Sequence, residues 1–427
     1  MLTAAISRYG ARVLPNTQQL IAACKARGEF IRGPQVAEFE AAFAARHGLD
    51  PSTAITAAYG RMAFYHILKA LDLPPGSEII FPSITFWVVP ELARVAGLTV
   101  VFADVDPKTF TLDPNSVERL ITDKTRAIVP THLYGLPCDM DRLLDIAGRH
   151  NLIVLEDCAH ALGALYRGRP VGTFGTGALF SFQTFKPLNC YGGGLALVPD
   201  AALAGRVRSL VEALPWPGEK RVRDRLFMGR LQRIFAKPWV FSISLFPVLW
   251  LSALIDANPD VFLWEKIRSL SPLPESYTER FPNVQAVIGL EALKYLDEWT
   301  AQAQANAQYV TRRLADLPGI QAPHVPPDRT HVYYQYCVYG PEGPARDDLV
   351  VRCVRRGIDI ETLHVDVPPD MELFGNAIAE ADGARRASQA MQIPVYCGLR
   401  QDQIERIADT VHAVLSEAAT TAAAARP

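Results

Sequence analysis

Short apolar runs alternate with stretches of helical periodicity between about residues 50 and 200. Hydrophobic positions at helical spacing, as in RMAFYHILKAL and MDRLLDIAGRH, predict amphipathic helices between the runs. The runs themselves are too apolar for strands with one exposed face, so they predict a mostly parallel sheet with helices on both faces. The four strands that we expect cover residues 78–82, 99–105, 127–133 and 152–158.

Beyond about residue 275, strand and helix patterns alternate again. LEALKYLDEW, residues 290–299, predicts an amphipathic helix, and the strand-like HVYYQYCVYG is followed by helical patterns. We therefore expect an α/β protein with a large domain over residues 1–215 and a smaller C-terminal α/β domain over residues 276–427. The segment between them, residues 216–275, does not show this alternation of strand and helix patterns.

The middle segment joins a basic stretch to an apolar one. Residues 219–237 carry seven basic and two acidic side chains, a local charge of +5, and residues 238–255 carry none. The apolar run reaches the lower length limit of a membrane-spanning helix, but Pro247 would interrupt such a helix, so we expect none. Two interpretations remain: an insertion packed against the protein itself or its dimer mate, or a peripheral membrane contact through residues 219–255.

The composition of the chain argues against several classes of function and site. The chain has 427 residues and a net charge of -2, so nucleic-acid binding by bulk charge is not expected. Seven cysteines without a CxxC pair favour a reducing compartment over a disulfide framework, and nine histidines without ligand spacing indicate no metal site. The first residues lack a signal-peptide pattern. We expect a cytoplasmic protein, or one peripheral to the inner face of the membrane.

The stretch from residue 155 to residue 196 carries most of the candidate chemistry. Asp157 ends an expected buried strand, where its carboxylate needs a cationic partner that a protonated pyridine nitrogen would supply. Phenylalanines flank Lys186, and such surroundings lower the pKa of an amine and suit Schiff-base chemistry. Three glycines, residues 192–194, permit a sharp turn or a close approach to a flat ring. Ligands of parallel sheets bind beyond the carboxyl ends of the strands, where the sequence places Phe86, His132, Tyr134, Asp157 and His160.

These motifs occur in an order that resembles a known family over nearly the whole chain. The motifs are RGEFIRGPQVAEFEAAFAARHGL, THLYGLPCDMDRLLDIAGRHNLIVLEDCAHALGA, SFQTFK, NVQAVIGLEALKYLDEW and QIPVYCGLRQDQIERIADTV. The sequence resembles the pyridoxal-phosphate-dependent sugar aminotransferases of the DegT/DnrJ/EryC1/StrS type, which have fold type I. The resemblance implies the fold type I architecture for this chain.

The resemblance also implies roles for individual residues. Lys186 would form the Schiff base (internal aldimine) with pyridoxal phosphate and then carry protons, and Asp157 would keep the pyridine nitrogen protonated. Phe86 would stack on the ring, and His160 would lie near the ring and its phenolic oxygen. A core position for Phe86 and a helix-capping role for His160 remain open. The phosphate would be held by Ser181 and by the backbone of Gly60, Arg61 and Met62, and the substrate by Tyr134, Arg280 and His364.

Several positions differ from the family pattern. Tyr59-Gly60-Arg61 replaces the usual Ser-Gly-Thr, and Arg61 can supply a charge-assisted phosphate contact in place of the hydroxyl. Gly192 replaces an acidic residue, and Phe185 replaces a threonine or serine before the lysine. Thr278 aligns with an asparagine that in the family reaches into the neighbouring subunit's site.

We therefore expect a transaminase that moves an amine from an amino acid, with glutamate the favoured donor, to a ketone. By resemblance, the ketone is a nucleotide-linked keto-sugar, and the protein is a homodimer with shared active sites. If the middle segment contacts a membrane, a lipid-linked or apolar ketone is the alternative acceptor. A non-catalytic, cofactor-binding regulatory protein is a further alternative. Lys186 disfavours the pyridoxamine-dependent dehydratase branch, and the lack of a GxGxxG motif disfavours nicotinamide binding.

Overall fold

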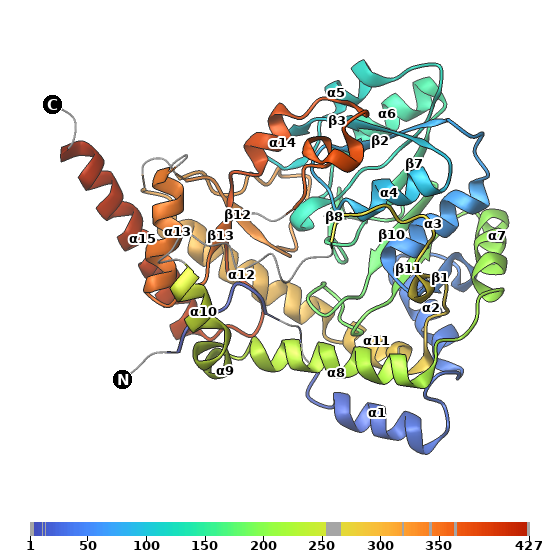
Figure 1. The fold of residues 1–427 in the computed structure, drawn as a ribbon, viewed down its shortest axis with the longest axis horizontal. Helices are drawn as coiled ribbons and strands as arrows, with labels where there is room; N and C mark the ends of the chain where they lie inside the picture. Colours follow the sequence, from blue (N-terminus) through green and yellow to red (C-terminus); the bar gives the residue numbers. More distant parts are fainter. Residues whose placement is uncertain are drawn as a thin grey trace.

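A computed structural model describes residues 4–10, 12, 14–252, 266–317, 320–340, 344–362 and 365–424. Its centre is an eight-stranded sheet (Figure 1) with the order β1-β11-β10-β7-β6-β2-β3-β14. Only the pairings of β11 with β1 and β10 are antiparallel, which confirms the mostly parallel sheet. The strands are β1 (Ala54–Ala57), β2 (Glu78–Pro82), β3 (Thr99–Ala103), β6 (Thr125–Ile128), β7 (Ile153–Asp157), β10 (Gly177–Ser181), β11 (Gly194–Leu197) and β14 (Ile378–Ala379).

Helices cover both faces of this sheet, as the apolar strands predict. In β2, Ile79 and Phe81 face one core cluster and Ile80 faces another, so side chains alternate between two buried layers. The first layer lies under α3 (Gly60–Leu71), α4 (Val88–Val95) and α7 (Ala201–Glu212). The second layer lies under α2 (Gln35–Arg46), α5 (Pro114–Leu120), α6 (Met140–His150) and α11 (Asn283–Leu293).

The expected strands differ in accuracy. The strand at 78–82 and the helix at 140–150 form over the expected residues. The expected strand at 99–105 divides into β3 and β4 (Val105–Asp106). The strand expected at 127–133 is wrong in its second half, because β6 ends at Ile128. Pro130 lacks an N–H and interrupts the regular ladder, although Thr131 still forms an isolated bridge with Asp157. The chain turns away at residues 133–135, where Tyr134 has a positive φ of 56°.

The C-terminal part builds a smaller sheet of three antiparallel strands, β12 (Tyr336–Val338), β15 (Met391–Ile393) and β13 (Glu361–Thr362). It packs with α12 (Leu296–Leu314), α13 (Pro344–Arg355) and α15 (Gln401–Ala424). The single helix expected at 290–299 is wrong, since α11 ends at Leu293 and α12 begins at Leu296. The break lets α11 pack on α2 while α12 packs on α15. The remaining helices and strands are α1 (Thr17–Ala26), α14 (Asp382–Ala387), β5 (Thr111–Leu112), β8 (Leu165–Tyr166) and β9 (Arg169–Pro170).

The middle segment forms α8 (Glu219–Phe235), α9 (Pro238–Ile243) and α10 (Leu245–Ser252) (Figure 1), and residues 253–255 of the apolar run lie outside the described part. One side of α8 packs on the protein itself, with Val222 and Leu226 buried. Arg225 Nη2 donates a hydrogen bond of 2.9 Å to the Tyr59 hydroxyl. Among the described helices, none has the length and apolar character needed to cross a membrane.

Candidate active site

The carboxyl ends of two neighbouring strands and the start of a helix meet at one edge of the large sheet. Asp157 is the last residue of β7, and Ser181 is the last residue of the adjacent strand β10. Helix α3 begins beside them, because a Cβ on Gly60 would lie 3.0 Å from the Cβ of Ser181. The first N–H groups of a helix have no partner within it, so this start is suited to bind an anion. The fold thus brings together three parts of the predicted phosphate and ring site.

The glycine run allows the lysine loop to close over the start of α3. The loop leaves β10 and returns at β11, where the Phe182 N–H donates to the Gly193 carbonyl at 3.0 Å. Gly192 and Gly193 have φ values of 128° and 92°, which only glycine adopts without strain. A Cβ on Gly194 would lie 2.1 Å from the Gly60 nitrogen. Any side chain at Gly194 would therefore displace the helix start.

Lys186 lies in this loop and is half-buried. Its Nζ is 4.7 Å from the centroid of the Tyr334 ring. Burial lowers the pKa of Lys186 to about 8, the Asp157 carboxylate opposes this shift, and the Arg61 charge adds to it. An amine with this pKa reaches its nucleophilic, neutral form much closer to neutral pH than an exposed lysine does.

Covalent loading of pyridoxal phosphate onto Lys186 should therefore depend on pH. Below the pKa of about 8 the amine is protonated, so we expect the loading rate to rise about tenfold per pH unit and to level off above it. Stopped-flow absorption of the apoprotein mixed with pyridoxal phosphate measures this rate. A rate that keeps rising to pH 10, as for an ordinary lysine, would contradict the burial of this amine.

Asp157 places a buried carboxylate at the end of β7. It is 5% exposed, and its Oδ1 accepts the Ala159 N–H at 2.9 Å. Burial raises the pKa of Asp157, while this hydrogen bond and the positive charge of Lys186 oppose the rise. A protonated pyridine nitrogen beside it would stabilise the charged carboxylate in the same way. The residue therefore fits the role that the sequence assigned to it.

His160 and Tyr334 form a stacked pair next to the lysine. Their ring centroids are 4.2 Å apart, and the His160 Nδ1 accepts the Tyr134 N–H at 3.3 Å. Burial, with a further effect from the Lys186 charge, holds the pKa of His160 well below its usual range. The ring is thus neutral with its proton on Nε2, which can donate to an oxygen. Residues 159–163 form turns and no helix, so the helix-capping role of His160 is wrong.

Aromatic rings surround the side chain of Arg61 at the start of α3. Its guanidinium carbon lies 5.0 Å from the centroid of Tyr59 and 5.1 Å from those of Phe86 and Tyr277. Arg61 also donates a hydrogen bond to the Tyr277 hydroxyl. Phe86 is half-buried at the edge of a core cluster, so it has a packing role and also faces this site. The Met62 N–H, by contrast, donates to the Tyr59 carbonyl at 3.0 Å.

Replacing Arg61 with methionine should weaken the binding of pyridoxal phosphate about tenfold, because a charge-assisted contact with the phosphate is lost. Equilibrium dialysis of the apoprotein gives the dissociation constant. Arg223→Met is the matched control, since Arg223 lies on α8 and is 53% exposed. An equal dissociation constant for the wild type and Arg61→Met would show that Arg61 does not contact the phosphate.

The predicted substrate residues lie in different surroundings. The Tyr134 side chain is buried and packs edge-on against Phe110. Its ring also stacks on that of His160, with the centroids 6.3 Å apart, and its N–H donates to His160 Nδ1. Arg280 stacks on Trp216, with its guanidinium carbon 4.1 Å from the ring centroid. It borders a cavity of about 360 Å³ whose lining does not include Lys186. His364 lies outside the described residues.

His132, which also follows an expected strand, has a structural environment. Its Nε2 lies 3.1 Å from Glu156 Oε2, and these two residues with Cys158 are close enough to be considered metal ligands. Glu156, however, already accepts backbone N–H groups from Gly172, Phe174 and Gly175 at 2.7–2.8 Å. These bonds account for the buried carboxylate without an ion. All seven cysteines are free and buried, as expected without a disulfide framework.

Sequence reasoning missed the residues that approach from distant parts of the chain. Tyr334 contacts Lys186 and His160 from the C-terminal part, and Tyr277 contacts Arg61. Arg225 reaches Tyr59 from α8. None of them belongs to a motif with recognisable spacing, so only the fold reveals their positions.

Known proteins resemble this chain over most of its length. The family model described as the DegT/DnrJ/EryC1/StrS aminotransferase family matches residues 14–231 and 260–412. GDP-perosamine synthase of Caulobacter vibrioides is 32% identical and covers 90% of this chain and 91% of its own. A pleiotropic regulatory protein of Geobacillus stearothermophilus is 29% identical, with coverages of 95% and 96%.

The fold agrees with solved structures of the same family. The structure of Streptomyces venezuelae DesV in complex with a ketimine intermediate superposes with a TM-score of 0.73 and 30% identity. It covers 93% of this chain and 94% of its own. The match extends over both the large sheet and the C-terminal part. The chain therefore belongs to the DegT/DnrJ/EryC1/StrS aminotransferase family and has the fold type I architecture of a sugar aminotransferase.

Proposed function

We propose that this protein is a pyridoxal-phosphate-dependent aminotransferase that uses Lys186 to move an amine from an amino acid to a keto-sugar. The observation that carries the proposal is the half-buried Lys186 amine, whose pKa burial lowers to about 8 and whose charge acts on the buried Asp157 carboxylate. Removing a charged amine or carboxylate from water costs free energy unless an opposite charge or a hydrogen bond compensates it. Groups with shifted pKa values of this kind cluster at functional sites. Lys186 would attach the cofactor covalently, and Asp157 would interact with its ring nitrogen.

The residues of the site fit pyridoxal phosphate at both of its ends. The start of α3 and Ser181 would hold the phosphate, with the Arg61 guanidinium as an added cation. When bound, the cofactor supplies an electron sink that stabilises negative charge on the carbon next to the transferred amine. Asp157 sustains this property by holding a proton on the ring nitrogen. His160 would donate its Nε2 proton to the phenolic oxygen and fix the tilt of the ring.

Lys186 has two tasks in this mechanism. It would attach the cofactor through Nζ, and the same Nζ, when free, would take the proton from the donor's α-carbon. Burial keeps Nζ near its neutral form, and the ring of Tyr334, 4.7 Å away, limits where it can move. The same group returns a proton to the acceptor carbon when the amine is delivered.

For the substrates, we propose glutamate as donor and a nucleotide-linked keto-sugar as acceptor. The name of the Caulobacter relative, a GDP-sugar synthase, supports the acceptor class. The test supplies ¹⁵N-labelled L-glutamate and a panel of nucleotide-linked keto-sugars to the reconstituted protein. Mass spectrometry should find the label in an aminated sugar. Label transfer to none of these sugars, with intact transfer to 2-oxoglutarate, would overturn the acceptor class alone.

We further propose a homodimer with shared active sites. Arg280 and Thr278 lie in the segment that, by family resemblance, reaches the neighbouring subunit. Arg280 stacks on Trp216 beside a cavity lined also by Arg32. Arg208 lines it as well but pairs with Glu40 at 2.9 Å, which leaves Arg280 and Arg32 as the cations available to a phosphate-bearing substrate. Light scattering gives the mass in solution. A monomer with full activity would overturn this arrangement.

A cofactor-binding regulatory protein is the second candidate. The Geobacillus relative, a pleiotropic regulatory protein, favours it, as does the replacement of the usual Ser-Gly-Thr by Tyr59-Gly60-Arg61. The two candidates differ in one result. A regulator would bind pyridoxal phosphate and leave it unchanged in the presence of amino acids.

A further inference from the structure

The outer surface of α8, α9 and α10, residues 219–252, is strongly apolar, and we call its exposed side chains the α8–α10 face. Twelve large hydrophobic side chains are exposed in the described part of the chain, and nine of them lie here. Monomer surfaces rarely gather so many in one place without a partner. Six are more than half exposed: Phe227, Met228, Trp239, Ile243, Val248 and Leu251.

The helices are anchored by one side, which leaves the apolar side outward. In α8, Gly229 packs on Tyr191, whereas Phe227, Leu231 and Phe235 recur every four residues on the opposite side. In α9, Phe241 is buried, and the Ala5 N–H donates to Ser242 Oγ at 2.6 Å. Trp239 and Ile243, four residues apart on the other side of α9, are 67% and 79% exposed.

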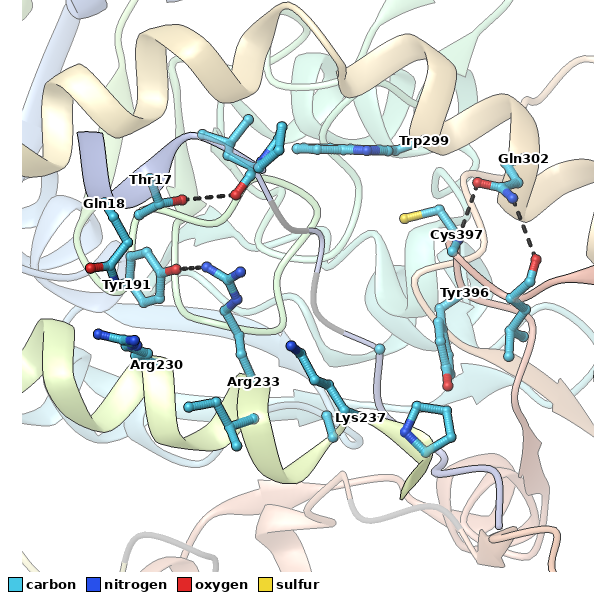
Figure 2. Close-up of a pocket in the computed structure, with 18 of the residues that line it drawn as sticks. Thr17, Gln18, Tyr191, Arg230, Arg233, Lys237, Trp299, Gln302, Tyr396 and Cys397 are labelled. Carbon is cyan, nitrogen blue, oxygen red and sulfur yellow. Dashed lines mark hydrogen bonds between the residues drawn. The ribbon is translucent and has the colours of Figure 1, made fainter. Parts of the chain in front are cut away.

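Positive charge borders this apolar surface. Residues 238–252 carry no charged side chain, whereas α8 and the residue before α9 supply Arg223, Arg230 and Lys237. A cavity of about 640 Å³ runs along α8 (Figure 2), with Arg230, Arg233 and Lys237 on one side and Trp299 opposite. Among the described residues, Arg233 Nε is buried without a hydrogen-bond partner. Glu298 also lines this cavity, so its basic side chains exceed its acidic ones by two.

The apolar helices are not part of what the family shares. The family model stops at residue 231 and resumes at residue 260, so α9, α10 and the end of α8 fall in the gap. Within the described residues, α9 and α10 cover six and eight positions, fewer than a bilayer-spanning helix needs. Apolar helices with tryptophan, next to basic residues, are typical of segments that lie in the membrane interface.

We propose that the α8–α10 face docks the protein peripherally on an anionic lipid bilayer, with α9 and α10 in the interface and Arg223, Arg230 and Lys237 on the lipid phosphates. The inference goes beyond the proposed transamination and does not depend on it. Apolar burial supplies attachment, and the cations supply the preference for anionic lipid.

Vesicle flotation of the full-length, cofactor-loaded protein tests the docking. Vesicles of phosphatidylcholine alone are compared with vesicles that also contain phosphatidylglycerol, at low and high salt. The variant Trp239→Ser/Ile243→Ser removes two exposed side chains of α9. The matched control is Leu210→Ser/Ile378→Ser, which removes exposed hydrophobic side chains on α7 and β14. Arg230→Glu/Lys237→Glu reverses charge beside the cavity.

The wild type and the matched control should float with anionic vesicles, and salt should weaken this binding. The α9 variant and the charge-reversal variant should bind at least about tenfold more weakly. Equal flotation of the α9 variant and the wild type would overturn the proposal, as would no flotation of the wild type. If the wild type stays in solution and the α9 variant loses oligomeric mass, the face is an interface between copies. The spectral change with glutamate, measured on each variant, separates loss of docking from loss of transamination.

Discussion

Lys186→Ala is expected to lose amine transfer from glutamate by at least about 10³-fold, the largest effect that we predict. The side chain provides both the covalent attachment and the mobile proton, and no other lysine is placed in the described site. The rate of ¹⁵N transfer from glutamate to 2-oxoglutarate measures the loss. Lys294→Ala is the control, since Lys294 is 68% exposed and pairs with Glu291.

The outcome for Lys186→Ala separates the two candidate functions. An inactive variant that still binds pyridoxal phosphate non-covalently agrees with the proposal, because the phosphate site is independent of the lysine. Transfer at more than a tenth of the wild-type rate would mean that another group carries the proton, and the assignment of Lys186 would fail.

Asp157→Asn should lower amine transfer on the order of 10²- to 10³-fold with little change in fold, because asparagine keeps the size and loses the charge. The amide can still accept the Ala159 N–H but cannot hold a proton on the ring nitrogen. Single-turnover kinetics with glutamate measures the chemical step apart from cofactor binding. The control is Asp141→Asn, on the exposed side of the protein where Asp141 pairs with Arg167.

A structural explanation for the Asp157 effect predicts a different result. If the carboxylate only stabilised the fold, Asp157→Asn would lower thermal stability and leave the single-turnover rate of the folded fraction unchanged. We expect the opposite, a slow chemical step in a protein that unfolds near the wild-type temperature.

The elements that the sequence predicted well are those whose pattern is local. Strand β2 and helix α6 form over the expected residues because each has a complete hydrophobic period and clear ends. The strand expected to reach residue 133 ends at Ile128, and beyond it only an isolated bridge at Thr131 continues the pairing. The helix expected at 290–299 is wrong because its two halves pack on different partners. Tertiary contacts determine where these two elements end, and a local hydrophobic pattern carries no information about tertiary contacts.

The site residues, too, divide into those that lie in one local stretch and those that come from distant parts of the chain. Lys186, Asp157 and His160 were predictable because they lie within one stretch of 30 residues around two adjacent strands. The rings of Tyr334 and Tyr277 come from the distant C-terminal half, and no spacing links them to Lys186 or Arg61. The burial of the Tyr134 side chain against Phe110 follows from its positive φ, which the sequence did not signal.

The absorption spectrum of the reconstituted protein, before and after L-glutamate, tests the central claim most directly. We predict a visible band of pyridoxal phosphate bound to Lys186 that bleaches with glutamate and returns with 2-oxoglutarate. A band that forms but does not respond to glutamate or any other amino acid would contradict transamination, and the regulatory candidate would then replace it.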